Sequence, residues 1–319
     1  MQKFVVTSSE SDQTLEKYVK KVLKDAPLSF IYKLFRKKDI KVNGHHQDRK
    51  FIVHTNDEVS IYITDEKVKE FSSVKEIKIT EDISSWVLFE DENILIINKP
   101  RGVLVQKDKS GDTALDDMVI SYLVSKKEYD PNKEKGFVPA PVHRLDRNTA
   151  GIIIFGKNLR ALQELGNVIN DKEKVIKKYM TLVEGICENT GKIDLFLKKL
   201  SSGRVIVDNK EGKESHTQFK LIESFNNYSL LDVSLLTGRT HQIRVHLSEI
   251  GHPVIGDTKY GNYELNKQIE KQYHFKNQFL VAYYLKFNGL DGELKYLNNK
   301  EFCIKLPNEC SELIDSLKM

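Results

Sequence analysis

A single carboxylate flanked by arginines is the feature of this chain best suited to chemistry. Asp146 lies between Arg144 and Arg147, and an apolar, β-branched run follows at residues 152–155. Nearby positive charge favours the ionised form of a carboxyl group, so Asp146 is a candidate nucleophile or base rather than an acid. The apolar run predicts a buried strand, which places Asp146 at the mouth of a sheet. The alternative is a surface aspartate in a turn, with solvated arginines balancing its charge.

Tyr179 is an aromatic candidate in a second segment. Residues 177–185 read Lys-Lys-Tyr-Met-Thr-Leu-Val-Glu-Gly, and their alternation predicts a strand that ends at Gly185. A tyrosine in a strand is most often a core residue. The strand pattern alone therefore favours a core position for Tyr179.

A third segment supplies another arginine. Residues 237–248 read Thr-Gly-Arg-Thr-His-Gln-Ile-Arg-Val-His-Leu-Ser, which predicts a helix capped by Thr240. Ile243 and Leu247 lie one turn apart on that helix. Arg244 follows Thr240 by one turn and is directed toward the start of the helix. The two histidines of the segment lack the spacing of metal ligands, so we expect no metal site here.

Four motifs carry a resemblance to a known enzyme family. They are HRLDRNTAGIIIFGKN at residues 143–158, KKY at 177–179, TGRTHQIRVH at 237–246 and NKPRG at 98–102. Together they resemble the signature of the RluA-type pseudouridine synthases, which isomerise uridine in RNA to pseudouridine. The usual family pattern has serine where this chain has Ala150.

The resemblance implies roles for five residues. Asp146 would be the catalytic residue, Tyr179 would stack on the target uracil, and Arg244 would pair with Asp146. Arg144 would occupy the position that the target nucleotide vacates when it is extruded from the RNA. Arg147 would be a further contact to RNA.

Ile243 or Leu247 would add an apolar contact to the bound uracil. Asp146 could attack C1′ of the sugar or remove a proton from C2′, and the sequence does not separate the two routes. Neither route needs a metal or any other cofactor. A hydrolase of the same bond would want a second carboxylate in the signature, and none accompanies Asp146.

The amino-terminal residues 1–65 resemble an S4 RNA-binding domain. Two amphipathic helices are predicted at 14–23 and from Ser29 to 38, followed by a strand at 40–44 that ends in an Asn-Gly turn. The cluster formed by Arg36, Lys37 and Lys38 would bind phosphates without reading sequence. The alternative is that these side chains are only the solvated face of a helix.

Composition narrows the class of protein. The chain has 319 residues, a net charge of +4 and three cysteines that form no CxxC pair, which predicts neither a disulfide framework nor a zinc site. A reducing cytoplasm fits this cysteine usage. No apolar run approaches the length of a membrane span, so we expect a soluble cytoplasmic protein.

RNA is the expected partner, and the segment LFRKKDIKVNG favours the RluC subgroup, whose substrate is 23S rRNA. A tRNA substrate and a catalytically silent RNA-binding assembly factor are the alternatives. We expect a monomer. The target uridine is not predicted.

The predicted fold class is α+β. We expect the S4-like module at 1–65, a charged linker at 66–85, and a catalytic domain at 86–319 with a mixed, largely antiparallel sheet and flanking helices. Further elements expected in that domain are a hairpin at 87–102, helices at 113–124 and 158–169, the first capped by Thr113, and strands at 228–236 and 279–287. The turn-rich segment 251–261 is expected to be architectural.

Overall fold

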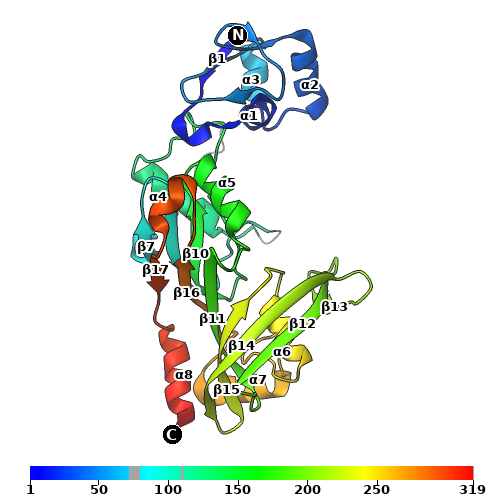
Figure 1. Cartoon of the computed structure of the whole chain (residues 1–319), viewed down its shortest axis with the longest axis vertical. Helices are drawn as coiled ribbons and strands as arrows, with labels where there is room; N and C mark the ends of the chain where they lie inside the picture. Colours follow the sequence, from blue (N-terminus) through cyan, green and yellow to red (C-terminus); the bar gives the residue numbers. More distant parts are fainter. Residues whose placement is uncertain (72–79, 109–110, 319) are drawn as a thin grey trace. The chain divides into compact units, whose positions relative to one another are not determined.

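The computed structural model describes residues 1–71, 80–108 and 111–318 (Figure 1). It divides into two compact units, and the chain passes between them several times. The first unit comprises Met1–Leu95, Gln106–Val142 and Ile154–Gly166, and the second comprises Ile96–Val105, His143–Ile153 and Asn167–Met319.

The amino-terminal part of the first unit has a small four-stranded sheet with the order β1-β6-β3-β4. Helices cover an apolar core in which Leu15, Tyr18 and Ile31 are almost fully buried. The elements are β1 (Gln2–Val5), η1 (Ser8–Glu10), β2 (Gln13–Thr14), α1 (Leu15–Val22), α2 (Leu28–Lys37), β3 (Ile40–Val42), β4 (His45–His46), β5 (Ile52–Val53), β6 (Glu58–Ile61) and α3 (Asp65–Phe71).

Local sequence signals explain much of this module. The Thr14 hydroxyl accepts a hydrogen bond from the Lys17 amide and caps α1. Asn43 and Gly44 both take positive φ angles, which a tight hairpin between β3 and β4 requires. The predicted cap at Ser29 is wrong, because α2 already begins at Leu28 after Pro27, a residue suited to a helix start.

Helix α3 occupies the beginning of the range 66–85 that the sequence predicts as a linker. Its Val68 is buried in the core of the amino-terminal module, and Phe71 packs against that core. This charged stretch has no clear hydrophobic period, because only one residue of the short helix is buried. The helix was therefore not predicted. We propose that the module extends to Phe71. Residues 72–79 of the expected linker lie outside the described residues.

The large sheet has the order β13-β12-β14-β15-β11-β16-β10-β8-β7, with β9 paired to β10 and β17 to β16. Strand β11 pairs antiparallel with both β15 and β16, whereas β10 runs parallel to β16. This confirms the predicted α+β class with a largely antiparallel sheet. The strands are β7 (Val87–Glu90), β8 (Ile94–Lys99), β9 (Ala140–Pro141), β10 (Ala150–Gly156), β11 (Val175–Glu184), β12 (Thr190–Lys199), β13 (Val205–Val207), β14 (Lys213–Phe225), β15 (Tyr228–Leu235), β16 (Leu280–Phe287) and β17 (Glu301–Cys303).

The helices of this part flank the sheet, and α6 packs against β12, β13 and β14 (Figure 1). They are η2 (Ser84–Trp86), α4 (Leu115–Ser125), α5 (Leu159–Val168), α6 (Gln242–Glu249), α7 (Tyr263–Tyr273), η3 (Gly292–Leu297) and α8 (Asn308–Lys318). The predicted cap at Thr113 is wrong: Ala114 precedes α4, and its amide donates to the Asp117 carboxylate. In the described residues, no helix is both long and apolar enough to cross a membrane.

Candidate active site

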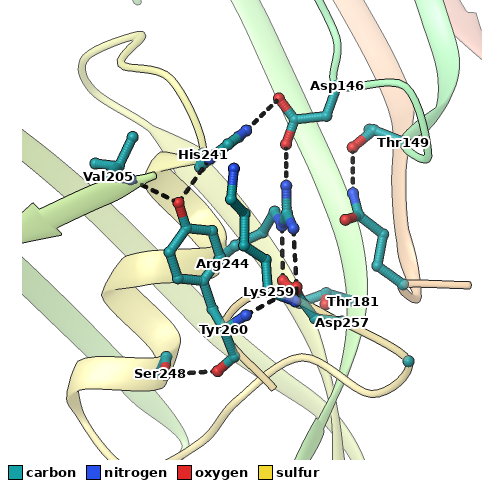
Figure 2. Close-up of polar contacts among 12 residues, drawn as sticks. Asp146, Thr149, Thr181, Val205, His241, Arg244, Ser248, Asp257, Lys259 and Tyr260 are labelled. Atoms are coloured by element: carbon teal, nitrogen blue, oxygen red, sulfur yellow. Dashed lines mark hydrogen bonds and ion pairs between the residues drawn. The ribbon is translucent and has the colours of Figure 1, made fainter. Parts of the chain in front are cut away.

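Asp146 lies in the loop that leads into β10, as the apolar run after it predicts. All seven residues of β10 are buried, so the strand is fixed within the sheet. Inside the loop, the Thr149 amide donates to the Asp146 carbonyl at 3.1 Å. The Thr149 hydroxyl in turn accepts a hydrogen bond of 2.7 Å from the buried Gln278 side chain (Figure 2). These bonds hold Asp146 at the end of a rigid strand.

A buried lysine supports the same loop from the other side. Lys99, at the end of β8, donates through Nζ to the carbonyl oxygens of Pro100 and Val103 at 2.9 Å and to that of Arg147 at 3.0 Å. Burial lowers the pKa of this lysine to about 7, although the negative charge of Asp146 opposes the shift. The motif NKPRG, which contains Lys99, thus lies directly against the Asp146 loop.

The Asp146 carboxylate is held by Arg244 of α6. Nη1 of Arg244 donates to Oδ2 of Asp146 at 2.8 Å. The other nitrogens of the guanidinium bind Asp257: Nε donates to Oδ2 at 2.6 Å and Nη2 donates to Oδ1 at 2.8 Å (Figure 2). Arg244 therefore joins a fully buried carboxylate to the one that faces the cleft.

The charges of this group stabilise one another despite burial. Burial opposes the charged form of Arg244, but both aspartates outweigh it and raise the pKa of the guanidinium. Burial likewise opposes the charge of Asp257, yet the hydrogen bonds and charge of Arg244 hold the pKa of its carboxyl below the usual value. The backbone amides of Lys259 and Tyr260 also donate to Asp257. The arginine is thus preorganised before any substrate binds.

A cleft of about 370 Å³ opens beside Asp146. Tyr179, Ile243 and Arg244 line it together with Asp146, so three distant segments meet there. Tyr179 is 6% exposed, and burial, with a smaller contribution from the charge of Asp146, raises the pKa of its hydroxyl. The remaining residues that line the cleft are Arg144, Leu145, Thr149, Leu235, Arg239, His241, Gln242 and Leu280.

The other predicted site residues fall in several places. Arg144 is exposed at the cleft, whereas Arg147 is half-buried and does not line it. Leu247 is fully buried and does not line the cleft, whereas Ile243 does. The structure therefore places Ile243, but not Leu247, where it could contact a bound base. In the amino-terminal module, three exposed side chains lie at the end of α2: Arg36, Lys37 and Lys38.

Sequence analysis missed two residues that surround the pair formed by Asp146 and Arg244. Asp257 belongs to the turn-rich segment that we expected to be architectural. The only feature of the sequence that could have pointed to Asp257 is Arg244, the arginine with which it pairs. His241 was considered only as a metal ligand, but its Nε2 lies 3.9 Å from Oδ1 of Asp146. His241 also precedes α6 directly, so the predicted cap at Thr240 is wrong. In the described residues, no cluster of three or more His, Cys, Asp or Glu is arranged to hold a metal.

Comparison with known proteins identifies the family. The family model for RNA pseudouridylate synthases matches residues 93–249. An RNA pseudouridine synthase from Mycoplasma capricolum is 34% identical over 309 residues, which cover 94% of this chain and 96% of that protein. The chain belongs to the RNA pseudouridine synthases. It is therefore an isomerase, and its substrate is RNA.

Two further comparisons describe the relatives of this synthase. The ribosomal large subunit pseudouridine synthase C of Haemophilus influenzae is 33% identical over 287 residues, which cover 88% of this chain and 85% of the relative. The solved structure of human RNA pseudouridylate synthase domain containing 4 has a TM-score of 0.59 at 20% identity, and the match covers 74% of this chain and 94% of the human one. The latter likeness concerns the fold.

Proposed function

We propose that this synthase modifies uridine in large-subunit ribosomal RNA with Asp146 as its catalytic residue. The observation that carries the assignment of Asp146 is its hydrogen bond to Arg244, in the cleft that Tyr179 also lines. The relative from Haemophilus influenzae is named for the large ribosomal subunit, which supports the substrate. No observation favours tRNA.

The isomerisation breaks the bond from N1 to C1′, turns the uracil and bonds C5 to C1′. The proton on C5 is lost and N1 gains one, so the base keeps its composition. Asp146 acts either as a nucleophile at C1′ or as a base at C2′, and in both routes its negative charge stabilises a cationic sugar. The Arg244 hydrogen bond fixes the carboxylate in the geometry that either route needs.

Other residues of the cleft enclose the base. Tyr179, with its hydroxyl protonated, stacks on the uracil, and Ile243 supplies an apolar contact. Arg144, exposed at the cleft, fills the place in the RNA that the extruded nucleotide leaves. Leu247 makes no contact to the base in this proposal, because it is fully buried on the same helix as Ile243 and does not line the cleft.

The amino-terminal module adds affinity for RNA. Arg36, Lys37 and Lys38 lie together in the last turn and cap of α2, exposed to solvent. Their charges contact phosphates, as does that of Arg147 nearer to the catalytic loop. We assign the module to residues 1–71 and the catalytic domain to the part of the chain that follows residue 79. We propose that the synthase acts as a monomer and, because its proposed substrate is ribosomal RNA, in the cytoplasm.

The test is tritium release from a transcript of large-subunit ribosomal RNA labelled with [5-³H]uridine. Asp146→Asn keeps the shape of the side chain but removes its charge, and we expect it to lower the rate at least about a thousandfold while RNA binding persists. Free uracil in the products would show a hydrolase. If the unaltered chain binds RNA but releases no tritium, it is a catalytically silent assembly factor. If it releases tritium only from labelled tRNA, its substrate is tRNA.

A further inference from the structure

A line of polar groups leads to the Asp146 carboxylate at the oxygen that does not bind Arg244. The backbone amide of Val205 donates to the hydroxyl oxygen of Tyr260 at 2.8 Å. That hydroxyl lies 2.7 Å from Nδ1 of His241, and Nε2 of the same ring lies 3.9 Å from Oδ1 of Asp146 (Figure 2). The line joins β13, the loop after Asp257 and the first residue before α6.

The hydrogen-bond pattern selects one tautomer of the imidazole. The Tyr260 oxygen already accepts a hydrogen bond from the Val205 amide, and among the described residues Nδ1 of His241 is the acceptor within reach of the Tyr260 hydroxyl proton. With the hydroxyl donating to Nδ1, a neutral imidazole carries its proton on Nε2. The donors then run in one direction, from Val205 through Tyr260 and His241 toward Asp146.

The two oxygens of Asp146 are held unequally. Oδ2 accepts a hydrogen bond of 2.8 Å from Arg244, whereas the 3.9 Å from Oδ1 to Nε2 of His241 is too long for a direct bond. The terminal torsion of an aspartate is soft, so one anchored oxygen does not fix the plane of the carboxylate. A second donor on Oδ1 would fix it.

We propose that His241 is a positioning residue for Asp146: its Nε2–H closes onto Oδ1 when RNA fills the cleft and locks the plane of the carboxylate. Hydrogen bonds of this kind are often long without substrate and tighten in the complex. His241 lines the cleft, so a bound nucleotide lies close to it. This inference rests on the proposed role of Asp146.

The surroundings keep the imidazole neutral. Burial lowers the pKa of His241 below its ordinary value of 6.5, and the charges of Arg244 and Lys259 add to the effect, while those of Asp146 and Asp257 oppose it. A protonated ring would need acceptors at both nitrogens and would turn the Tyr260 hydroxyl away. The neutral donor is therefore the active form.

The backbone supports a functional reading of His241. The residue takes a left-handed conformation with φ of 53° and ψ of 18°, and its side chain makes no capping hydrogen bond to α6. Such a conformation is costly for a side chain with a Cβ, and residues of this kind gather at functional sites. Here it allows His241 to reach the cleft from the start of the helix.

The experiment measures single-turnover tritium release from the labelled ribosomal transcript at saturating enzyme. It first compares the unaltered synthase with three single variants. His241→Ala removes the donor, and we expect the rate to fall about ten- to a hundredfold with little change in RNA affinity. His241→Gln places an amide donor where Nε2 stood and should stay within about fivefold of the unaltered synthase. Tyr260→Phe keeps the aromatic ring against Arg204 and Arg244 but removes the hydroxyl that selects the tautomer of His241. We expect it to lower the rate several-fold.

The decisive comparison is the double variant. Glutamine needs no tautomer to be selected, so Tyr260→Phe should cost nothing further in the His241→Gln background. The unaltered synthase should also lose activity on the acid side of pH 6.5, as the ring becomes protonated, and His241→Gln should lack that loss. Equal costs of Tyr260→Phe in both backgrounds, or a His241→Ala variant with the full rate, would overturn the proposal.

His246→Gln is the matched control. His246 is a fully buried histidine on the same helix, bonded through Nε2 to the Ser215 hydroxyl at 2.8 Å. This variant should lower the melting temperature and leave the rate of the folded synthase and its pH profile unchanged. A change in pH profile equal to that of His241→Gln would show a general effect of buried histidines and overturn the assignment. Absence of release by the unaltered synthase would instead count against the proposed function.

Discussion

Arg244 and Asp257 form a bidentate ion pair that the Asp146 carboxylate joins from one side. Two nitrogens of the guanidinium donate to the two oxygens of Asp257, at 2.6 and 2.8 Å, and the third donates to Asp146. Asp257 is 1% exposed and Arg244 is 7% exposed. The geometry of the pair is therefore already set before the substrate binds.

Replacing Asp257 by asparagine should impair both folding and catalysis. The substitution removes a negative charge beside a buried guanidinium, and breaking a buried pair in this way costs about 3 to 5 kcal/mol of the free energy of unfolding. Arg244 would also lose the partner that orients it toward Asp146. We expect a rate at least tenfold lower under conditions in which the variant is folded, measured by urea denaturation and tritium release.

Asp232→Asn is the control for this effect. Asp232 is a partly buried aspartate of β15 that pairs with Lys178 at 3.0 Å and accepts a hydrogen bond from Tyr283. Its loss should lower stability without changing the rate of the folded synthase. If Asp257→Asn likewise left that rate unchanged, Asp257 would be only a stabilising residue.

Arg244→Lys tests whether the planar shape of the guanidinium, or only its positive charge, is needed to hold Asp146. A lysine keeps the positive charge but cannot form the planar bidentate pair with Asp257 and donate to Asp146 at the same time. We expect the rate to fall about a hundredfold, which corresponds to about 3 kcal/mol of lost transition-state stabilisation. Retention of more than half of the activity at saturating RNA would show that charge alone is sufficient.

The sequence predicted the residues that meet at the cleft better than it predicted their support. Motifs in separate segments located Asp146, Tyr179 and Arg244, because each has a distinctive neighbourhood. Asp257 lies in a turn-rich run without a hydrophobic period, where no local pattern marks a buried carboxylate.

The error at Leu247 has a different cause. Helix α6 is buried on several sides, from Gln242 to Leu247, so its sequence has no single apolar face that marks the cleft. Ile243 and Leu247 lie one turn apart, yet only Ile243 lines the cleft. Strands β12, β13 and β14 were also not predicted. Strands β12 and β14 carry many charged, exposed positions that weaken the alternation, and β13 has only three residues.

Gly151→Ala should destabilise β10, the strand that follows the Asp146 loop. Gly151 has a φ of 120°, and a Cβ there would lie 2.2 Å from the carbonyl oxygen of Ala282 in the parallel strand β16. Backbone strain and the displaced strand together should cost about 2 to 4 kcal/mol. Gly166→Ala in α5 is the control, since nothing lies within 4 Å of its Cβ position, and it should stabilise the helix by about 0.5 to 1 kcal/mol. Denaturation midpoints that move in the same direction for both variants would contradict this.

Lys99→Met should change how stability depends on pH. The pKa of Lys99 is about 7 in the folded chain against 10.5 for an ordinary lysine, so between these values the unfolded chain binds more protons. Stability contributed by this group therefore rises with pH from about 7 to 10.5, by up to about 1.4 kcal/mol per pH unit. Subtracting the unfolding free energy of the methionine variant from that of the unaltered chain should give this slope. The exposed Lys199→Met gives the baseline, and an equal pH dependence for both variants would refute the assignment.

Removing the basic cluster of α2 should weaken RNA binding without slowing catalysis. Replacing Arg36, Lys37 and Lys38 by alanine removes up to three phosphate contacts, each of which contributes roughly 0.7 to the slope of log affinity against log salt. We expect weaker binding at low salt, a slope smaller by up to about 2, and an unchanged single-turnover rate at saturating enzyme. The control replaces the exposed Lys267, Lys271 and Lys276 by alanine, which changes the net charge equally. The same fall in slope for both triple variants would show that only total charge matters, and the cluster would then be no more than the solvated end of a helix.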